Sequence, residues 1–389
     1  MDSNRFISRK SEEIVLDLCS YFPAVAVVGP RQVGKTTLVQ HLRAHIQKPT
    51  IYLDLESTTD KEKLSHPQLL FSGYEDHTII LDEVQKMPEL FPLLRGIIDR
   101  NRQPGRFILL GSASPDLIRD SSETLAGRIA YYELAPFSYQ EISQRIDWQT
   151  HWLRGGFPDS LLAPSEKFSI LWRKNFIQTY LERDLQDLGL SADPLLTSRL
   201  WRMCAHMSGS VINYSNLSRS LGISVPTVQK YLDFFEAAFL IRRIPPYVTN
   251  LKKRMVKAPK LYIRDSGILH QLLAIPGLFE LSGNPAIGAS WETYVIEQII
   301  AIAPDWAEFS FFRTQNGAKI DLVISRAGIA EVIIEIKYSS TPSLSKGFAI
   351  ATEDLQPKKS FIVAPVELPY PYSPSVNVIG LAHLDLIFE

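Results

Sequence analysis

The sequence has few cysteines and no long apolar run. Its two cysteines, Cys19 and Cys204, lie far apart and lack the spacing of metal ligands, which argues against a disulfide framework and a zinc site. No stretch approaches the roughly 18 uninterrupted apolar residues of a membrane-spanning helix. The N-terminal residues Met-Asp-Ser-Asn-Arg-Phe contain no apolar signal core. We therefore expect a cytoplasmic protein with no membrane partner.

Net charge is also nearly absent, at −1 over 389 residues. Such a balance says nothing about partners until it is divided by region, because acidic neighbours can hide a basic module. Apolar residues make up 45% of the chain and charged residues 21%, as in a soluble globular protein. No internal repeat or low-complexity run is present, and the length predicts two or three domains.

A complete phosphate-binding loop lies near the N-terminus. An apolar run at residues 24–28 predicts a buried strand, and Gly29-x4-Gly34-Lys35-Thr36 follows it and opens a helix. The glycines let backbone N–H groups turn toward a phosphate, and the helix N-terminus is electropositive. We expect Lys35 to reach the β- and γ-phosphates and the Thr36 hydroxyl to bind Mg²⁺. The predicted nucleotide-binding residues are Gly29, Pro30, Arg31, Gln32, Val33, Gly34, Lys35, Thr36 and Thr37.

Apolar strands alternate with helical stretches after this loop, at residues 49–55, 77–81 and 106–110. This alternation predicts a parallel, doubly wound α/β sheet, which binds ligands at the carboxyl ends of its strands. The second of these strands is followed by Asp82 and Glu83. We expect Asp82 to help hold the metal and Glu83 to act as the general base that activates water.

Two further groups are candidates for contacts with the γ-phosphate. The strand at residues 106–110 runs into a serine-containing turn, in which Ser112 or Ser114 is placed to sense the phosphate; a plain serine-rich turn is the alternative. Arg128 follows a glycine turn and is a candidate arginine finger for the nucleotide of a neighbouring subunit. A surface arginine is the alternative for Arg128. Other arginines compete for the finger role, namely Arg95, Arg100 and Arg102.

In this order the motifs resemble those of the bacterial and archaeal AAA-type ATPases that carry a C-terminal domain of unknown function. The resemblance extends over nearly the whole chain, and it implies an AAA+-like P-loop core at residues 1–147, hydrolysis of ATP with Mg²⁺, and assembly into a homo-oligomer. One departure is Ser112, where many AAA+ proteins have Asn. The matching segments are the phosphate-binding loop, Leu81–Glu83, Gly111-Ser112, Leu125–Arg128, Leu134–Glu141 and Gly155–Pro158.

The middle of the chain is predicted to be helical. At residues 148–194 apolar side chains follow one helical face, which predicts a lid that packs on the core. Residues 195–260 contain a short helix closed by Gly222, a second helix capped by Ser224, and a strand near residues 239–244, which is the pattern of a winged helix. Eleven Lys and Arg residues stand there against two acidic residues, which leaves a formal charge of +9.

A basic winged helix is expected to bind nucleic acid through the phosphates. The expected partner is DNA, with branched or otherwise structured DNA among the candidates, and the second helix would enter the major groove. The alternative is a winged helix that binds protein and whose lysines are only solvated. The predicted DNA contacts are Thr227, Gln229, Lys230, Arg242, Arg243, Lys252 and Lys253.

The terminal region, residues 261–389, contains two neighbouring strands that combine charged and apolar residues, at 319–324 and 331–337. Because strand side chains alternate between faces, Glu335 and Lys337 share a face. Asp321 on the paired strand can converge with them. An edge strand that carries charges for solubility is the alternative interpretation.

This Asp…Glu-x-Lys pattern resembles that of the PD-(D/E)XK nuclease superfamily, whose domains have an α/β fold. The resemblance implies that Asp321 and Glu335 hold Mg²⁺ and that Lys337 positions or activates water. A further acid from the preceding helix, Glu292 or Glu297, would complete the metal site.

Together the modules predict an ATP-hydrolysing protein that acts on DNA through its winged helix and nuclease-like domain, with DNA endonuclease activity as an open possibility. The alternative is a nucleotide-switched regulatory or scaffold protein whose terminal domain is catalytically inactive. A small-molecule kinase is disfavoured, because Asp82 and Glu83 are suited to activating water and no acceptor pocket is evident.

Overall fold

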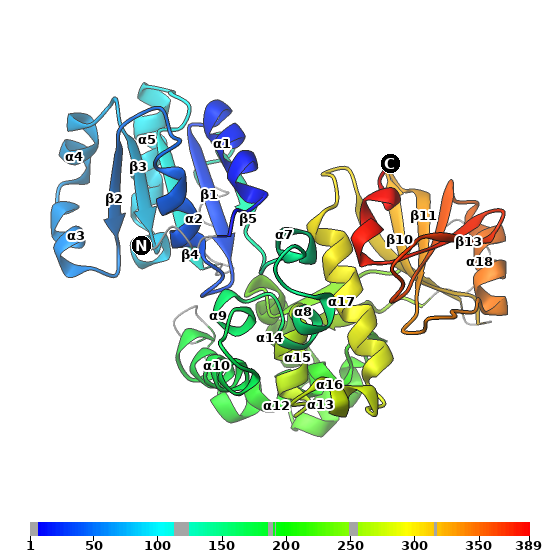
Figure 1. Ribbon diagram of the computed structural model, residues 1–389. Helices are drawn as coiled ribbons and strands as arrows, with labels where there is room; N and C mark the ends of the chain where they lie inside the picture. Colours follow the sequence, from blue (N-terminus) through cyan, green and yellow to red (C-terminus); the bar gives the residue numbers. More distant parts are fainter. Residues whose placement is uncertain (1–6, 113–123, 186–189, 191, 249–255, 315–316) are drawn as a thin grey trace. The chain divides into compact units, whose positions relative to one another are not determined.

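The computed structural model describes residues 7–112, 124–185, 190, 192–248, 256–314 and 317–389 (Figure 1). The chain divides into two compact units. The N-terminal unit comprises residues 1–137 with the short segments 187–190 and 237–239. The C-terminal unit comprises the rest of the chain.

A five-stranded parallel sheet forms the centre of the N-terminal unit. Its strands are β1 (Ala24–Gly29), β2 (Thr50–Asp54), β3 (Thr78–Asp82), β4 (Phe107–Ser112) and β5 (Ile129–Glu133). The strand order is β2-β3-β4-β1-β5, and every pair is parallel. Every residue of β1 is buried, as expected of a central strand that is covered on both faces. The predicted parallel α/β core is therefore confirmed.

Helices cover both faces of this sheet, because successive side chains of a strand point to opposite faces. Val25 and Val27 of β1 pack in one apolar cluster with residues of α1 and α2, whereas Ala26 and Val28 pack in another with residues of α4 and α5. The helices are α1 (Ser11–Tyr21), α2 (Lys35–Leu42), α3 (Thr58–Lys63), α4 (Pro67–Gly73), α5 (Leu90–Arg100) and the short 3₁₀ turn η1 (Val84–Lys86).

Helices also make up the first part of the C-terminal unit. They are α7 (Tyr139–Ile142), α8 (Trp148–Arg154), α9 (Pro158–Leu161), α10 (Glu166–Thr179) with the π-helical turn η2 (Tyr180–Asp184), α12 (Pro194–His206), α13 (Tyr214–Leu221) and α14 (Val225–Ala237). The aromatic side chains of α10 pack on one another, with the rings of Trp172 and Phe176 stacked at 5.0 Å. Arg173 of the same helix is fully buried and donates to the backbone oxygen of Leu153 at 2.9 Å. Packing thus accounts for the later part of the apolar face that the sequence shows here, whereas Phe168 and Leu171 of the same face are exposed.

A small antiparallel sheet accompanies α12, α13 and α14. It consists of β6 (Ser210–Val211), β7 (Ile241–Ile244) and β8 (Lys260–Ile263), in the order β6-β8-β7. Asn213 caps the start of α13, and Gly222 ends that helix in the left-handed conformation. At the start of α14 the Ser224 hydroxyl accepts a hydrogen bond from the backbone N–H of Thr227 at 3.3 Å. Local capping residues therefore set both ends of α13 and the start of α14.

A mixed six-stranded sheet dominates the terminal region. Its strands are β9 (Glu308–Arg313), β10 (Lys319–Arg326), β11 (Ile329–Ile336), β12 (Lys359–Val363), β13 (Tyr370–Ser373) and β14 (Val376–Ile379). In the order β13-β14-β12-β11-β10-β9, strands β11, β12 and β14 run parallel, and the remaining pairs are antiparallel. The accompanying helices are α15 (Ser266–Leu272), α16 (Leu278–Ser282), α17 (Ile287–Ala301), α18 (Lys346–Leu355) and the 3₁₀ segment η3 (Leu381–Ile387).

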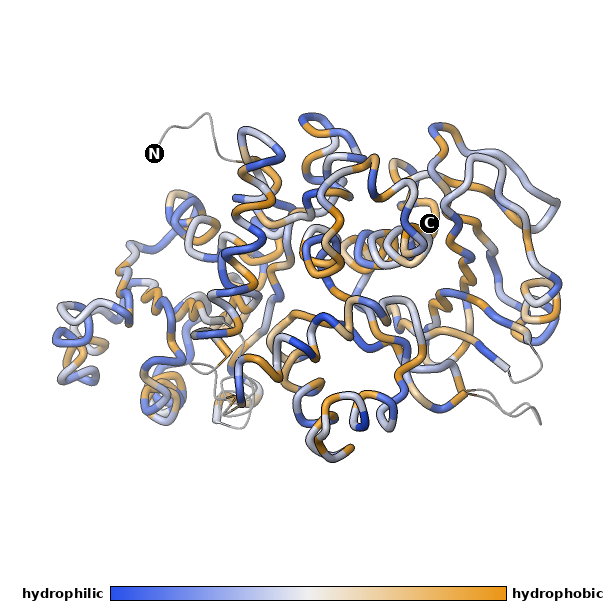
Figure 2. Tube along the Cα trace, turned by 90° about the horizontal axis from the view of Figure 1, so that it is seen from below, coloured by the Kyte–Doolittle hydropathy of each residue, from blue (hydrophilic) through white to orange (hydrophobic). Residues whose placement is uncertain are grey.

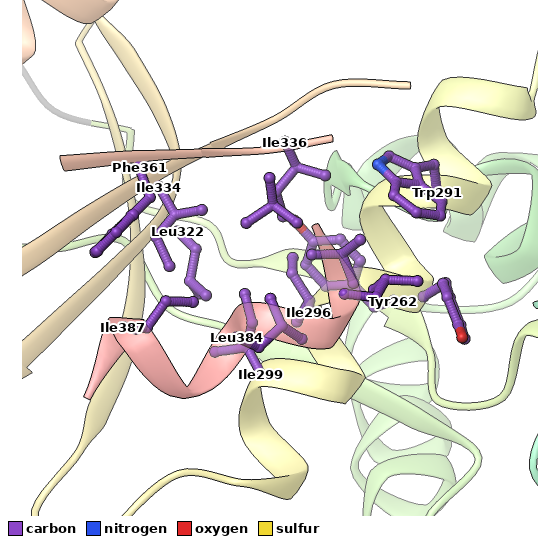
Figure 3. Close-up of a cluster of buried hydrophobic side chains, with 14 of the residues drawn as sticks. Tyr262, Trp291, Ile296, Ile299, Leu322, Ile334, Ile336, Phe361, Leu384 and Ile387 are labelled. Carbon is purple, nitrogen blue, oxygen red and sulfur yellow. The ribbon is translucent and has the colours of Figure 1, made fainter. Parts of the chain in front are cut away.

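The largest apolar cluster of this region lies between the mixed sheet, α17 and η3. Figure 3 shows Leu322 and Ile334 of the sheet facing Leu384 and Ile387 of η3, with Ile299 of α17 beside them. Val332, Ile334 and Ile336 of β11 all belong to this cluster, so one face of that strand is apolar as predicted. Glu335 lies on the opposite face of β11, and its side chain is also buried.

Strand β8 spans the predicted domain boundary between residues 260 and 261. It pairs with β6 and β7, yet Lys260 and Tyr262 also contact Glu292 of α17. A further link is the bridge between Pro246 and Phe311 of β9. The small sheet and the mixed sheet are therefore joined at several places within the C-terminal unit.

Hydrophobic residues are distributed along the whole chain. Figure 2 shows hydrophobic and hydrophilic residues alternating at short intervals along the trace. Within the part of the chain that the structure describes, no helix is long and apolar enough to cross a membrane.

Candidate functional site

The phosphate-binding loop connects β1 to α2 at the carboxyl edge of the parallel sheet. Gly29 ends β1 and pairs with Ser112, the last residue of β4. Gln32 and Gly34 have φ angles of 62° and 98°, in the left-handed region that glycine adopts most easily. Gly34 stands at the N-cap of α2, where the described residues supply no side-chain cap. The first N–H groups of this helix are thus available to an anion.

Lys35 is folded back onto this loop. Its ammonium group donates to the backbone oxygens of Gly29 at 3.0 Å and Pro30 at 2.9 Å, and the side chain is buried. Burial lowers the pKa of Lys35 to about 8, although the carboxylates of Glu83 and Asp82 oppose this shift. The lysine is therefore positioned at the mouth of the loop and has two carboxylates near it.

Asp82 connects three elements around the loop. Its Oδ2 accepts hydrogen bonds from the Thr36 hydroxyl at 2.7 Å and from the Tyr52 hydroxyl at 2.6 Å. Its Oδ1 accepts from the backbone N–H of Glu83 at 2.9 Å. The hydroxyl oxygen of Thr36 and a carboxylate oxygen of Asp82 are thus close enough together to approach the same magnesium ion. Tyr52, on the neighbouring strand β2, was not predicted from the sequence.

Glu83 has a left-handed backbone conformation, with φ of 54°. This turn lets the side chain leave the end of β3 at an angle that an extended residue would not have. The side-chain amide of Gln85 donates to the Glu83 carboxylate. Burial raises the pKa of Glu83, although Lys35 and Gln85 oppose the rise. A raised pKa suits a carboxylate that takes a proton from water.

The other predicted residues of this unit are placed as follows. The guanidinium of Arg128 pairs with Asp99 of α5, with Nε 2.5 Å from Oδ1. Arg102 donates to the backbone oxygen of Gly127 at 2.6 Å, in the same turn. The structure describes Ser112 only as the end of β4, and Ser114 lies outside the described residues. The choice between sensor and turn therefore stays a prediction.

A second group of ionisable residues lies in the C-terminal unit, and we call it the carboxylate cluster. It consists of Glu292, Asp321 and Glu335 with the lysines Lys260, Lys319 and Lys337. Lys337 Nζ lies 2.6 Å from Glu335 Oε1, and Lys319 Nζ lies 3.2 Å from Asp321 Oδ1. Asp321 sits where the pairing of β10 with β9 shifts register, and Ile336 N–H donates to its Oδ2 at 3.2 Å. The three predicted residues Asp321, Glu335 and Lys337 are thus brought together.

The acid that α17 contributes to this cluster is Glu292. Its Oε1 accepts from Lys260 Nζ at 2.8 Å and from the Tyr262 hydroxyl at 2.7 Å, and Lys260 Nζ also lies 3.4 Å from Asp321 Oδ1. Glu297, the other predicted candidate, instead pairs with Arg242 and Arg264. The geometry therefore favours Glu292 over Glu297 as the partner of Asp321.

Burial and neighbouring charges shift the pKa values in this cluster. Burial, and then the Asp321 carboxylate, raises the pKa of Glu335 to about 7, although Lys337 opposes the rise. Burial and Asp321 also raise the pKa of Glu292. Burial alone would raise the pKa of Asp321, but Lys260 and Lys319 lower it below its ordinary value. The pKa of each carboxylate in the cluster therefore depends on the charges of its neighbours.

The two sites differ in how they suit a metal ion. At the phosphate-binding loop the Thr36–Asp82 pair faces an uncapped helix end, which fits Mg²⁺ because that ion keeps water and phosphate oxygens as its other ligands. In the carboxylate cluster, the Lys260 ammonium contacts both Glu292 and Asp321, so these carboxylates do not fit a divalent cation. Over the described ranges, no group of three or more His, Cys, Asp or Glu is arranged to hold a metal.

Two mycobacterial relatives decide the family. The uncharacterized proteins Rv2008c of Mycobacterium tuberculosis and Mb2031c of Mycobacterium bovis are each 41% identical to this chain over 358 residues, which cover 92% of this chain and 80% of each relative. This chain belongs to their family. An uncharacterized protein of Haemophilus influenzae is 23% identical over 282 residues, which cover 64% of this chain and 69% of that protein.

Three family models match the chain in succession. The first is an AAA domain at residues 21–143, which makes the N-terminal unit of this family member an AAA-type P-loop domain. The others are domains of unknown function, DUF8612 at residues 145–278 and DUF4143 at residues 287–384. The match to an AAA domain and the parallel sheet together imply nucleotide binding.

Solved structures of a Walker-type ATPase and of a replication initiator are similar over part of the chain. The Walker-type ATPase PABY2304 of Pyrococcus abyssi has a TM-score of 0.48 and 16% identity, and the match covers 70% of this chain and 97% of that one. The replication initiator DnaA, bound to AMPPCP and single-stranded DNA, has a TM-score of 0.32 and 12% identity, and covers 60% of this chain and 90% of that one.

The predicted DNA-contacting residues of this family member fall into three groups. Gln229 and Lys230 of α14 are exposed, and Thr227 is half-buried at the start of that helix. Arg242 instead pairs with Glu297 and Arg243 with Glu236. Lys252 and Lys253 lie outside the described residues. Acids from outside the basic stretch neutralise part of its charge, because Glu297 pairs with Arg242 and Lys260 pairs with Glu292 and Asp321. The stretch is therefore less positive in the folded chain than the count of its own residues indicates.

Proposed function

We propose that this protein binds and hydrolyses ATP at the loop between β1 and α2. The observation that carries the proposal is the hydrogen bond between the Thr36 hydroxyl and Asp82, beside a buried Lys35 and an uncapped helix N-terminus. When bound, Mg²⁺ would neutralise phosphate charge and stabilise the leaving group. Thr36 and Asp82 are the residues that would hold it.

The chain's own residues have separate roles in this proposal. Lys35 leaves the carbonyl oxygens of Gly29 and Pro30 and donates to phosphate oxygens, which are stronger acceptors because they are charged. The N–H groups at the start of α2 bind phosphate oxygens in the same way. Glu83 accepts a proton from the attacking water, and Gln85 holds its carboxylate in place.

Lys35→Met is expected to weaken nucleotide binding by about tenfold or more, because hydrogen bonds to charged groups contribute about 1.5–3 kcal/mol each. Titration of the purified chain with a fluorescent ATP analogue and Mg²⁺ measures the change. Lys63→Met is the control, since Lys63 is an exposed lysine of α3 in the same unit. Equal affinity of the two variants would contradict the proposed role of Lys35.

The second part of the proposal is that residues 194–263 form a winged helix that binds DNA and couples it to ATP turnover. In support, α12, β6, α13, α14, β7 and β8 follow in the order of helices and strands expected of that module. The three strands form one antiparallel sheet, and α14 exposes Gln229 and Lys230. A helix with exposed polar residues near its start is suited to a DNA groove.

DNA is therefore expected to stimulate ATP hydrolysis, with a stimulation that falls steeply as salt increases. Lys230→Glu should weaken this DNA dependence and reduce the slope of log K against log salt by about one. Lys167→Glu, at an exposed position of α10, is the control for the change in charge. Linear, circular and branched DNA are compared in the same assay. No DNA dependence with any of them would favour the alternative, a nucleotide-switched protein that binds other proteins.

Assembly into a homo-oligomer completes the proposal. Arg128 would have to leave Asp99 in order to reach the nucleotide of a neighbouring subunit, and this ion pair is partly exposed, so its loss is of small energetic consequence. For the terminal domain, we propose a nuclease-like fold that acts as a scaffold, because Lys260 contacts the carboxylates that a metal would need.

A further inference from the structure

The carboxylate cluster contains equal numbers of acids and bases. Three carboxylates, from Glu292, Asp321 and Glu335, stand against three lysines. Lys319 and Lys337 are partly exposed, at 44% and 33%, whereas Lys260 has only 6% of its side chain exposed. Lys260 is therefore the cation that lies inside the cluster.

Lys260 makes the contacts that a bound cation would make. Its ammonium nitrogen lies 2.8 Å from Glu292 Oε1 and 3.4 Å from Asp321 Oδ1, and 5.6 Å from the centre of the Phe311 ring. Tyr262, two residues along β8, donates to the same oxygen of Glu292. A divalent cation between these carboxylates would be close to the ammonium group, and the repulsion of the two charges is large in a buried place.

Glu335 supplies an independent observation. Its side chain is fully buried, and its Oε2 has no hydrogen-bond partner among the residues that the structure describes. An unpaired buried oxygen beside Asp321 would invite a cation in a nuclease centre. The other oxygen of Glu335, Oε1, lies 2.6 Å from the ammonium group of Lys337, so this carboxylate also has a lysine beside it.

We propose that Lys260 is the built-in cation of the carboxylate cluster, and that this nuclease-like centre is a metal-free site that anchors β8 to the terminal sheet. This inference rests on the proposed scaffold role of the terminal domain and is independent of the proposed ATPase activity. It assigns the cluster a binding role within the protein: Lys260 and Tyr262 extend from the small sheet, and Glu292 and Asp321 receive them from α17 and β10. These contacts hold the small sheet against the terminal domain.

Manganese binding to the full chain, measured by calorimetry without nucleotide, tests the proposal. The wild-type chain is expected to bind no Mn²⁺ at the carboxylate cluster, so its calorimetric signal should be the same as that of Asp321→Asn. Lys260→Gln is expected to gain Mn²⁺ binding, which is lost again when Asp321→Asn is added. Mn²⁺ binding by the wild-type chain that depends on Asp321 would overturn the proposal, and this measurement needs no Lys260 variant to fold.

A double-mutant cycle of unfolding stability is the second test, and it decides for or against the proposal if no variant binds Mn²⁺. Lys260→Gln should lower the urea midpoint of unfolding, because it leaves two buried carboxylates without their cation. Adding Glu292→Gln should recover at least half of that loss, and Lys260→Arg, which keeps the charge, should lose less. Recovery supports the proposal, including the case in which only the double variant folds. Losses that simply add would overturn it.

Discussion

Glu83→Gln is expected to bind ATP as the wild type does and to hydrolyse it about 100-fold more slowly or worse, since a positioned general base contributes about 10²–10⁴-fold. Glutamine has nearly the same shape, so the left-handed turn at residue 83 and the position of the side chain are retained. What is lost is the ability to accept a proton from water. Steady-state phosphate release and nucleotide titration, measured on the same preparation, separate the two effects.

A nearby glutamate serves as the control for this variant. Glu89 lies at the exposed start of α5, six residues after the proposed base. Glu89→Gln should therefore leave both binding and turnover close to wild-type values. Turnover by Glu83→Gln at the wild-type rate would remove Glu83 as the base, and a simultaneous loss of nucleotide binding would assign it a structural role instead.

Gly267→Ala is expected to destabilise the C-terminal unit by about 3 kcal/mol or more. A Cβ at this position of α15 would lie 2.1 Å from the backbone oxygen of Arg154 and 2.7 Å from the backbone nitrogen of Gly155. These are backbone atoms, so no flexible side chain can yield. Arg173 also donates to the Leu153 and Gly267 oxygens, at 2.9 Å and 3.2 Å, and so holds the two segments together.

The matched control is a glycine in another helix of the same unit. Gly288 lies in the first turn of α17, and a Cβ there meets nothing within 4 Å. Gly288→Ala should stabilise the unit by about 0.5–1 kcal/mol, because alanine restricts the unfolded chain and favours helix. Urea unfolding of both variants, followed by tryptophan fluorescence, should therefore give changes of opposite sign. A small change for Gly267→Ala would show that α8 and α15 can separate easily.

The nucleotide site was predictable from the sequence because its parts are local patterns. Gly29 to Thr36 are contiguous, and the buried strand before Asp82 is marked by four consecutive apolar or β-branched residues. Parallel strands bring their carboxyl ends to one edge, so two motifs about fifty residues apart meet without further information. Tyr52 escaped prediction because a tyrosine on a strand has no pattern that distinguishes packing from a contact with Asp82.

The carboxylate cluster shows the opposite case. Asp321, Glu335 and Lys337 were predicted to converge because β10 and β11 are neighbours in the chain and pair as a hairpin. Lys260 and Tyr262 come from a strand about sixty residues earlier, and nothing in their local sequence shows which helix or sheet β8 contacts. The charge count of residues 195–260 failed to reflect the surface for the same reason, since Arg242 finds Glu297 only through packing.

The local sequence was enough to specify a phosphate-binding loop, a threonine and an aspartate that meet beside it, and the parallel sheet that carries them. Strand and helix periods and glycine conformations are local properties. Long-range packing determined the rest: it placed Lys260 between two carboxylates and turned Glu297 toward two arginines. Whether a buried acid meets a metal or a lysine depends on which distant element packs against it, and the residues around that acid do not encode this choice.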